Sequence, residues 1–496
     1  MKNIIFFLLT FIHFFFVHAQ TVVSGKVFFD NNNNTLLDKG EKGLKGVLVS
    51  NGKDIVKTDK YGNYKIVTIQ GNKVFVIKPS QYISPLLENR PQFFLSQNDI
   101  KNQVYHFPLQ KHKEPKNLNI TLLGDPQVDI IDDVHHVDKL VTQELNKEDV
   151  DFIIPLGDLT FDNHDMFAPL SASLGLIGTP VFNVMGNHDQ NYNAKHFNDR
   201  DADFEKFFGP SYYAYEFGSE LCLVLNNIYP KGDKGYVGKL DEDQYVFVNE
   251  VLNQMKQKHQ SIYVFMHIPL EEMEDHQRVL NLFKAFPEVM IVAGHTHTQY
   301  QKSFARENLP AVKELVAGAV CGSWWQGPHD SNHIPFAFMY DGTPKGYWFL
   351  NTDKNHLTYK VSGRAKDFQI EITVPERNEW DTALNDLNDD YIYANIFAGS
   401  ENTTVQISYD GDNWFDMEKY NSVAPKLKQL YKLQQEGRFK GQNISVMPIP
   451  KTISDHLWRI KIPKKLQKGT YLILVKAKDD ETGLDVLGKR VLRISE

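Results

Sequence analysis

Cysteine is scarce in this chain, which has only Cys222 and Cys321 among 496 residues. Two cysteines exclude a disulfide framework and any zinc module built on cysteine. In an oxidising compartment the two thiols could pair, or each could be a small buried apolar residue, and the sequence leaves both open. Basic residues are not in excess, since 54 Lys and Arg against 62 Asp and Glu give a formal charge of −8. Stable binding to nucleic acid is therefore not expected.

Several common catalytic motifs are also missing. There is no P-loop, no glycine fingerprint for dinucleotides, no G-x-S-x-G turn and no H-E-x-x-H helix. Beyond residue 19 no segment is apolar enough to cross a membrane. What is present is an ordinary globular composition, 42% hydrophobic and 23% charged. The length predicts two to four domains.

The first 19 residues have the features of a secretory signal. Lys2 gives a positive start, a mostly apolar run extends from Ile4 to Val17, and Val17-His18-Ala19 has the small-x-small form of a cleavage site. A membrane anchor is the alternative, but the run is shorter than the roughly 20 residues that cross a bilayer. We therefore expect export to the periplasm or the cell exterior, with no transmembrane anchor after the signal is removed.

Three regions follow this segment. Residues 20–112 hold short strand-like runs separated by Asn, Gly and Asp turns, which predicts a small β-sandwich module. Residues 117–330 alternate apolar strands with helical patterns, which predicts a layered α/β domain. Residues 331–496 return to short strands, which predicts a β-rich C-terminal domain.

Helical patterns stand out in three places. One covers about 136–146, and a second, about 241–258, opens with an acidic cap and closes on lysines. The third, about 424–436, interrupts the strands of the C-terminal region and has Pro425 in its first turn, where proline is tolerated.

A loop in the first region has the spacing of a calcium site. Oxygen-bearing side chains stand at loop positions 1, 3, 5, 9 and 12, and position 7 can offer its carbonyl. Thr35 stands where glycine is expected, and a plain polar turn is the alternative. A calcium ion here would stiffen the module and do no chemistry. The candidate ligands are Asp30, Asn32, Asn34, Leu36, Asp38 and Glu41.

Five apolar runs of the central region each end in residues that can bind a metal. Because strands of an α/β sheet run mostly parallel, their carboxyl ends gather at one edge, so these side chains are expected to converge. Carboxylate, amide and imidazole groups without sulfur suit Mn, Fe, Zn or Mg. The five clusters are Asp125-Pro126-Gln127, Asp158, Asn187-His188-Asp189, His267 and His295-Thr296-His297.

This donor set suits phosphoester chemistry. Two divalent ions about 3.5–4 Å apart can clamp the attacking and leaving oxygens and lower the pKa of a bound water. Asp158 is the natural bridging carboxylate, and His188, beside Asn187, could protonate the leaving oxygen or hold a phosphate oxygen. A lone histidine after a strand is usually structural, but five ordered clusters at strand ends favour one shared site.

The ordered series GDPQ, GDLTFD, GNHD, MH and GHTH resembles the calcineurin-like metallophosphoesterase superfamily. The likeness covers about residues 117–300 and implies a four-layer α/β/β/α sandwich, here in an exported bacterial member with N- and C-terminal β-domains. It also implies two divalent ions. The first ion would be held by Asp125, Asp158 and His297, and the second by Asp158, Asn187, His267 and His295, with His188 assisting the leaving group.

One motif departs from the family pattern. Gln127 stands where the family usually has histidine, and an amide oxygen is a harder and weaker ligand than imidazole. Gln127 could ligate directly, act through water or leave the first site poorly occupied. The departure affects metal identity more than catalysis, because the other motif positions are intact.

Supporting residues are suggested by position alone. Asp162 and Asp189 could each orient an imidazole, although Asp189 could equally cap or bond backbone. Trp324 and Trp325 could stack on a sugar, base or lipid if exposed, or join domains if buried.

These observations predict an exported phosphoester hydrolase, a phosphodiesterase or phosphatase, that uses a metal-bridging hydroxide. The substrate would be a small-molecule, lipid or sugar phosphoester, and the oligomeric state is left open. The rival interpretation is a surface protein that binds glycan or a partner on a degenerate phosphoesterase scaffold. Gln127 is the only residue that favours this rival.

Overall fold

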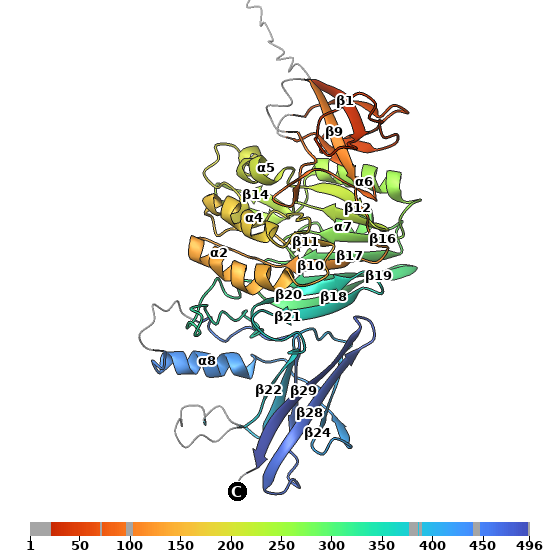
Figure 1. Cartoon of the computed structure of the whole chain (residues 1–496). Coiled ribbons are helices and arrows are strands. Elements are labelled where there is room, and N and C mark those ends of the chain that lie inside the picture. Colours follow the sequence, from red (N-terminus) through yellow and green to blue (C-terminus); the bar gives the residue numbers. More distant parts are fainter. Residues whose placement is uncertain are drawn as a thin grey trace, which may run out of the picture.

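The computed structural model describes residues 21–69, 72–95, 103–375, 385, 389–439 and 447–494. The expected secretory signal, residues 1–19, lies outside this part of the chain. Figure 1 shows a β-rich module (red and orange) at one end of a central α/β body and a second β-rich domain (blue) at the other end. The architecture is thus mixed α/β with flanking β domains.

The N-terminal module has two sheets, and two strands of the second sheet, β2 (Leu48–Ser50) and β5 (Phe75–Ile77), are buried along their whole length. In the first, β1 pairs antiparallel with β4 and parallel with β9, and its order is β4-β1-β9-β6. The second has the order β3-β2-β5, and β7 and β8 form a separate hairpin. The strands are β1 (Val22–Phe29), β2 (Leu48–Ser50), β3 (Ile55–Lys57), β4 (Asn63–Val67), β5 (Phe75–Ile77), β6 (Tyr82–Ile83), β7 (Leu86–Leu87), β8 (Arg90–Pro91) and β9 (Val104–Lys111).

Buried polar contacts tie this module to the central domain. The ammonium of Lys78 lies 2.7 Å from Glu114 Oε1, and both side chains are almost fully buried. The same ammonium donates to the carbonyl of Glu216, and the Ser80 N–H donates to the Glu216 carboxylate at 3.0 Å. A buried pair of this kind fixes geometry, since losing one partner would leave an uncompensated charge.

Two sheets form the centre of the molecule. The smaller has the order β11-β10-β20-β21, with β10 and β11 parallel. The larger has the order β12-β13-β16-β17-β19-β18, and β13, β16, β17 and β19 run parallel. The strands are β10 (Asn119–Leu123), β11 (Phe152–Pro155), β12 (Tyr213–Phe217), β13 (Glu220–Val224), β16 (Ser261–Phe265), β17 (Glu288–Ala293), β18 (Gln299–Arg306), β19 (Leu309–Ala317), β20 (Gly346–Asn351) and β21 (His356–Val361).

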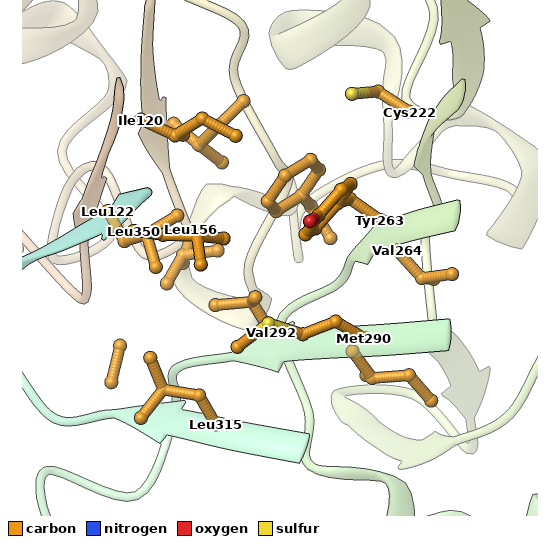
Figure 2. Close-up of a cluster of buried hydrophobic side chains, with 14 of the residues drawn as sticks. Ile120, Leu122, Leu156, Cys222, Tyr263, Val264, Met290, Val292, Leu315 and Leu350 are labelled. Atoms are coloured by element: carbon orange, nitrogen blue, oxygen red, sulfur yellow. The ribbon is translucent and has the colours of Figure 1, made fainter. Parts of the chain in front are cut away.

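The main core lies between these sheets. Figure 2 shows Leu122 and Leu350 of the smaller sheet and Leu156 beside it, across from Val292 and Leu315 of the larger sheet. All five side chains are fully buried. Burying such aliphatic groups contributes roughly 1.5–3 kcal/mol each. This packing gives the strand ends a rigid base.

Helices pack on both sheets. The expected helix at 136–146 is observed as a continuous run of α2, a π-helical turn and α3, which with α4 covers the smaller sheet through a second apolar cluster. The helix expected at 241–258 is α6, and Asp241 caps it by accepting the Gln244 N–H at 2.8 Å. The helical elements of the central domain are α2 (Ile131–Val137), η1 (Asp138–Thr142), α3 (Gln143–Leu145), η2 (His164–Met166), α4 (Phe167–Gly175), η3 (Asn187–Asp189), η4 (Phe197–Asp199), α5 (Ala202–Phe208), α6 (Glu242–Met255), η5 (Leu270–Glu272) and α7 (His276–Leu282). The hairpin of β14 (Ile228–Lys231) and β15 (Gly235–Gly238) lies beside them.

The C-terminal domain is a pair of four-stranded antiparallel sheets with one helix, α8 (Pro425–Gln435), at the predicted place with proline in its first turn. The sheet orders are β22-β23-β27-β26 and β25-β24-β28-β29. The strands are β22 (Ile370–Thr373), β23 (Tyr391–Ile396), β24 (Thr404–Ser408), β25 (Trp414–Asp416), β26 (Glu418–Lys419), β27 (Leu457–Lys461), β28 (Gly469–Asp479) and β29 (Leu484–Ile494).

The central sheet extends into the range 331–496 that the sequence assigns to the C-terminal domain. β20 pairs antiparallel with β10, and β21 pairs with β20. The central α/β unit therefore includes residues up to Val361 in space. No helix within the described ranges is long and apolar enough to cross a bilayer.

Candidate metal centre

The metal-competent residues follow the ends of neighbouring strands. Asp125 and Gln127 follow β10, and Asp158 follows β11. His267 follows β16, and His295 follows β17. Because these strands run parallel within their sheets, their carboxyl ends deliver the side chains to one place.

Three of these side chains meet closely. Asp158, His267 and His295 each offer one ligand atom, and these atoms lie within 4.8 Å of one another. His267 Nε2 is 3.3 Å from Asp158 Oδ2 and 3.2 Å from His295 Nδ1. Asn187 Oδ1 is 3.1 Å from the same His267 nitrogen. These four residues are the set that the family resemblance assigns to the second ion.

A second group of candidate ligands lies around Asp125. His297 Nε2 is 3.9 Å from Asp125 Oδ1. The Gln127 amide nitrogen donates to Asp158 Oδ2 at 3.4 Å, and its oxygen is 3.7 Å from the buried Cys321 thiol. Gln127 therefore lies beside the centre with its nitrogen toward Asp158. Direct ligation by Gln127 stays a prediction.

The tautomers of the histidines fit metal binding. His267 Nδ1 is 2.8 Å from the Leu156 carbonyl, and His297 Nδ1 is 2.6 Å from the Gly322 carbonyl. A carbonyl can only accept, so each Nδ1 carries hydrogen and each Nε2 is the nitrogen left for a metal or a second proton. Each Nε2 faces a carboxylate oxygen. Acceptors that face acceptors in a buried site need a cation or proton between them, so the residues present fit divalent ions.

Burial and charge set the ionisation of these groups. Burial alone would raise the pKa of Asp158, but the charge and hydrogen bond of His267 outweigh it and hold that pKa well below its ordinary value. Burial would lower the pKa of His267, but Asp158 raises it to about 9. Burial lowers the pKa of His295 to about 3, helped by His267, and that of His297 to about 4. His295 and His297 are therefore neutral near pH 7, the form that binds a metal, whereas His267 must release a proton to do so.

The backbone is strained at this centre. Several of the predicted ligands have the left-handed conformation that favours glycine, which costs of order 1–3 kcal/mol per residue and clusters at functional sites. Gly186 allows the close approach, because a Cβ there would lie 2.0 Å from the Asp158 nitrogen. The positive φ angles are 37° at Asp125, 43° at Gln127, 46° at Asp158, 75° at His295 and 51° at His297.

His188 lies at the edge of the centre and is partly exposed. Its N–H donates to Asp158 Oδ1 at 2.8 Å, and its Nδ1 is 2.9 Å from Asp162 Oδ1. The ring stacks on Phe161 with centroids 4.6 Å apart. Asp162 thus contacts this imidazole, and its role in orienting the ring for catalysis stays a prediction.

Asp189 bonds backbone groups, which is the alternative that the sequence leaves open for it. Its carboxylate accepts the N–H groups of Gly186, Leu159 and Thr160 at 2.9–3.1 Å. Burial, together with the charge of Asp158, raises the pKa of Asp189 to about 6. The residue holds the Asp158 and Asn187 loops together.

The two adjacent tryptophans have different environments. Trp324 is 40% exposed, and its ring centroid is 5.6 Å from those of His297 and Phe161. Trp325 is buried and donates from Nε1 to the Pro126 carbonyl at 3.1 Å. Only Trp324 is therefore placed to touch a ligand. Phe161 and Tyr340, whose ring is 6.2 Å from Trp324, complete an aromatic wall that no motif in the sequence indicates.

The two cysteines are free and buried. Cys222 lies in β13, inside the main core, whereas Cys321 lies 3.9 Å from His297 Nδ1. Burial raises the pKa of both thiols. They are small buried residues that do not pair.

The candidate calcium loop folds around its oxygen side chains. Asp30 accepts the N–H groups of Asn34 and Thr35, and Glu41 accepts those of Asn31 and Asp38. The amides of Asn32 and Asn34 both donate to Asp38. Thr35 has a φ of 67°, the conformation that glycine supplies at this loop position, and the Leu36 side chain is exposed. Calcium binding stays a prediction.

Comparison with known proteins places the centre in a family. Residues 118–299 match calcineurin-like phosphoesterase, residues 31–112 match its N-terminal region, and residues 314–482 match its C-terminal region. No curated protein matches the sequence.

Two solved structures show weak likeness. A dimetal phosphatase from Danio rerio is 15% identical, with 50% of this chain and 96% of that chain covered and a TM-score of 0.35. A β-glucuronidase from Parabacteroides merdae is 9% identical, with 96% and 77% covered and a TM-score of 0.16. Neither likeness is close enough to bear on function. The three family matches account for most of the chain, which belongs to the calcineurin-like phosphoesterase superfamily.

Proposed function

We propose that this protein is a phosphoester hydrolase that depends on two divalent metal ions. The observation that carries the proposal is the convergence of Asp158, His267 and His295 at strand ends, with their ligand atoms within 4.8 Å. Asp158 Oδ2 is within 3.4 Å of both His267 and Gln127, and Asp158 is the residue that we propose the two ions share. The proposed fold is the four-layer α/β/β/α sandwich, which the two facing sheets and their helices support.

Each group at the centre has a distinct task. Asp125, Asp158 and His297 would hold one ion, and Asp158, Asn187, His267 and His295 the other. Two such ions, of Mn, Fe, Zn or Mg, would supply an activated water and neutralise phosphate charge.

The chain's own residues do the rest. His188 is oriented by Asp162 through Nδ1, which leaves Nε2 to donate to a phosphate oxygen or to the leaving oxygen. Stacking on Phe161 restricts rotation of this ring. The half-exposed Trp324 offers a flat apolar surface to one ester group of the substrate.

Export is part of the proposal. The apolar N-terminal segment that begins after Lys2 supports a secretory signal and a location in the periplasm or outside the cell. The substrate would then be a small-molecule, lipid or sugar phosphoester.

The test is metal content and turnover of purified protein. We expect about two transition metals per chain, and hydrolysis of bis- or mono-nitrophenyl phosphate. Asp158→Ala and His267→Ala should each lose turnover by at least a hundredfold while remaining folded. Asp132→Ala, an exposed aspartate of α2, is the control and should keep wild-type activity.

Wild-type rates in the first two variants would refute the mechanism. Metal-free protein that binds glycan tightly would favour the rival interpretation of a binding protein on a degenerate scaffold.

A further inference from the structure

A polar hollow adjoins the metal centre on the side of His188. Its volume is about 550 Å³, and it is lined by the segments 162–165 and 190–193 together with Asp203 and Lys234. Hollows of about 300–1,000 Å³ hold small-molecule ligands. This one has room for a group the size of a monosaccharide.

The hollow is continuous with His188. Asp162, which lines it, contacts the His188 ring at 2.9 Å. His164, which also lines it, has Nε2 3.4 Å from the His188 carbonyl. An ester group on the His188 side of a phosphate at the centre would therefore enter this hollow.

The walls of the hollow are held in place by hydrogen bonds. The Asn163 amide donates to the Asp129 carbonyl at 2.7 Å, and the Tyr192 hydroxyl donates to the Asn187 carbonyl at 2.9 Å. Asp203 accepts from the Asn191 amide at 2.8 Å and faces His164 Nδ1 at 3.3 Å. Such fixed side chains recognise a ligand with little loss of side-chain entropy.

Gln190 offers an unused acceptor. Its side chain is only 2% exposed, and its nitrogen donates to the Ile228 carbonyl at 3.3 Å. Its oxygen has no hydrogen-bond partner among the residues that the structure describes. A buried acceptor without a donor costs about 1–3 kcal/mol, and Gln190 belongs to the residues that line the hollow.

The charges of the hollow select against further anions. Three carboxylates, those of Asp162, Asp165 and Asp203, face a single lysine, Lys234. A second phosphate or a carboxylate would be repelled. Two of the three carboxylates already face imidazoles, of His188 and His164, which reduces any special attraction for an organic cation. Carboxylates and amides in this balance suit hydroxyl groups.

We infer that the hollow binds an uncharged polyhydroxy alcohol, of the size of a sugar or cyclitol, as one ester group of the phosphoester substrate. This inference rests on the proposed hydrolase function and names the substrate class for the same centre. It requires no anionic or cationic group beyond the phosphate itself.

The test compares esters that differ only in hydroxyl groups. The protein with its metals would be given the methyl phosphodiesters and the phosphomonoesters of myo-inositol, cyclohexanol and 2-aminoethanol, and release of each alcohol would be measured. We expect kcat/KM for the inositol ester to exceed that for the cyclohexyl ester at least tenfold, since buried polar groups reject an analogue that lacks the hydroxyl.

A variant locates the preference in the hollow. Gln190→Met keeps the length of the side chain but removes both the acceptor and the amide that donates to the Ile228 carbonyl, and should reduce the inositol-to-cyclohexyl ratio at least threefold. Gln143→Met changes an exposed glutamine of α3 in the same way and should leave the ratio unchanged.

The outcomes separate this inference from the proposed function. Hydrolysis of bis-nitrophenyl phosphate with equal rates for the inositol and cyclohexyl esters would overturn the inference alone, as would preference for the aminoethyl ester. If Gln190→Met leaves the inositol-to-cyclohexyl ratio of kcat/KM unchanged, the hollow is not the cause of the preference for inositol, and the inference is overturned. Hydrolysis of bis-nitrophenyl phosphate without hydrolysis of the inositol esters would also overturn the inference alone. Failure to hydrolyse every ester, the nitrophenyl phosphates included, would overturn both proposals.

Discussion

Gln127 is the residue at which this centre differs from its family, and it can be changed back. Gln127→His should place an imidazole nitrogen next to Asp158, because the two side chains have similar volume. Imidazole binds Mn, Fe and Zn more strongly than an amide does. We expect the variant to retain its metals at a chelator concentration at least tenfold higher, measured by elemental analysis after dialysis. Gln143→His is the matched exposed control, and equal metal loss in all three proteins would contradict the expectation.

Asp201 predicts a pH dependence of stability. Burial, reinforced by the charge of Glu205, raises the pKa of Asp201 to about 7 from an ordinary value of 3.8. The folded state therefore holds this proton more tightly than the unfolded state, and the stability it contributes is full below pH 4 and is lost as pH rises through 7.

Asp201→Asn should remove that part of the pH dependence. Between pH 5 and pH 8 the free energy of unfolding of the wild type should fall by about 2 kcal/mol more than that of the variant. Urea unfolding at the two pH values measures this, with the exposed Asp199→Asn as control. A fall of the same size in Asp201→Asn would show that other groups cause it.

The residues of the centre were predictable because strand ends are readable from sequence. Asp125, Asp158 and His267 each end an apolar run, and that pattern is local. Phe161 and Gln190 could not be found this way, because their roles depend on which side chains face them across the fold. Asp162 was suggested only because it follows Asp158 closely in the sequence. The structure shows that its contact is the ring of His188.

At the scale of elements, the loop between β1 and β2 predicts a calcium response. Calcium at a hundred times its dissociation constant should stabilise the folded module by about 2.7 kcal/mol, because it binds only the folded loop. Thermal unfolding with and without calcium measures this. Glu41→Gln removes one charge from the twelfth loop position. The variant should need at least ten times more calcium than the wild type to reach the same stabilisation.

Controls decide whether that effect is specific. Magnesium at the same concentration should give a smaller shift, because it prefers a smaller and more rigid site. If calcium shifts the unfolding temperature equally in the wild type and in Glu41→Gln, calcium does not act through this loop.

Helices were more predictable than sheet order. α6 follows from Asp241, whose carboxylate caps the helix in the way its sequence position indicates. The pairing of β20 with β10 joins residues more than 200 positions apart, and no local pattern encodes such a partner. A helix whose end carries a capping residue can thus be predicted from the sequence. The partner of a strand more than 200 residues away cannot, because it is decided by how the core packs.

At the scale of the whole molecule, that pairing predicts how the chain can be shortened. A protein of residues 21–330 would lack β20 and β21 and leave the edge of β10 exposed, next to a core that normally includes Trp348. We expect it to aggregate or to show no cooperative unfolding. A protein of residues 21–368 keeps both strands and should unfold cooperatively. Thermal unfolding and size-exclusion chromatography compare the two, and equal cooperativity would show that these strands are dispensable.

The left-handed backbone at Asp125, Asp158 and His295 has a consequence for evolution in the laboratory. Glycine would adopt these angles without strain, so selection for heat resistance alone should drive carboxylates and imidazoles out of these positions. Selection for turnover should keep them. Selection for stability and selection for activity should therefore favour different residues at these three positions. Variants that gain heat resistance there are expected to lose catalytic activity.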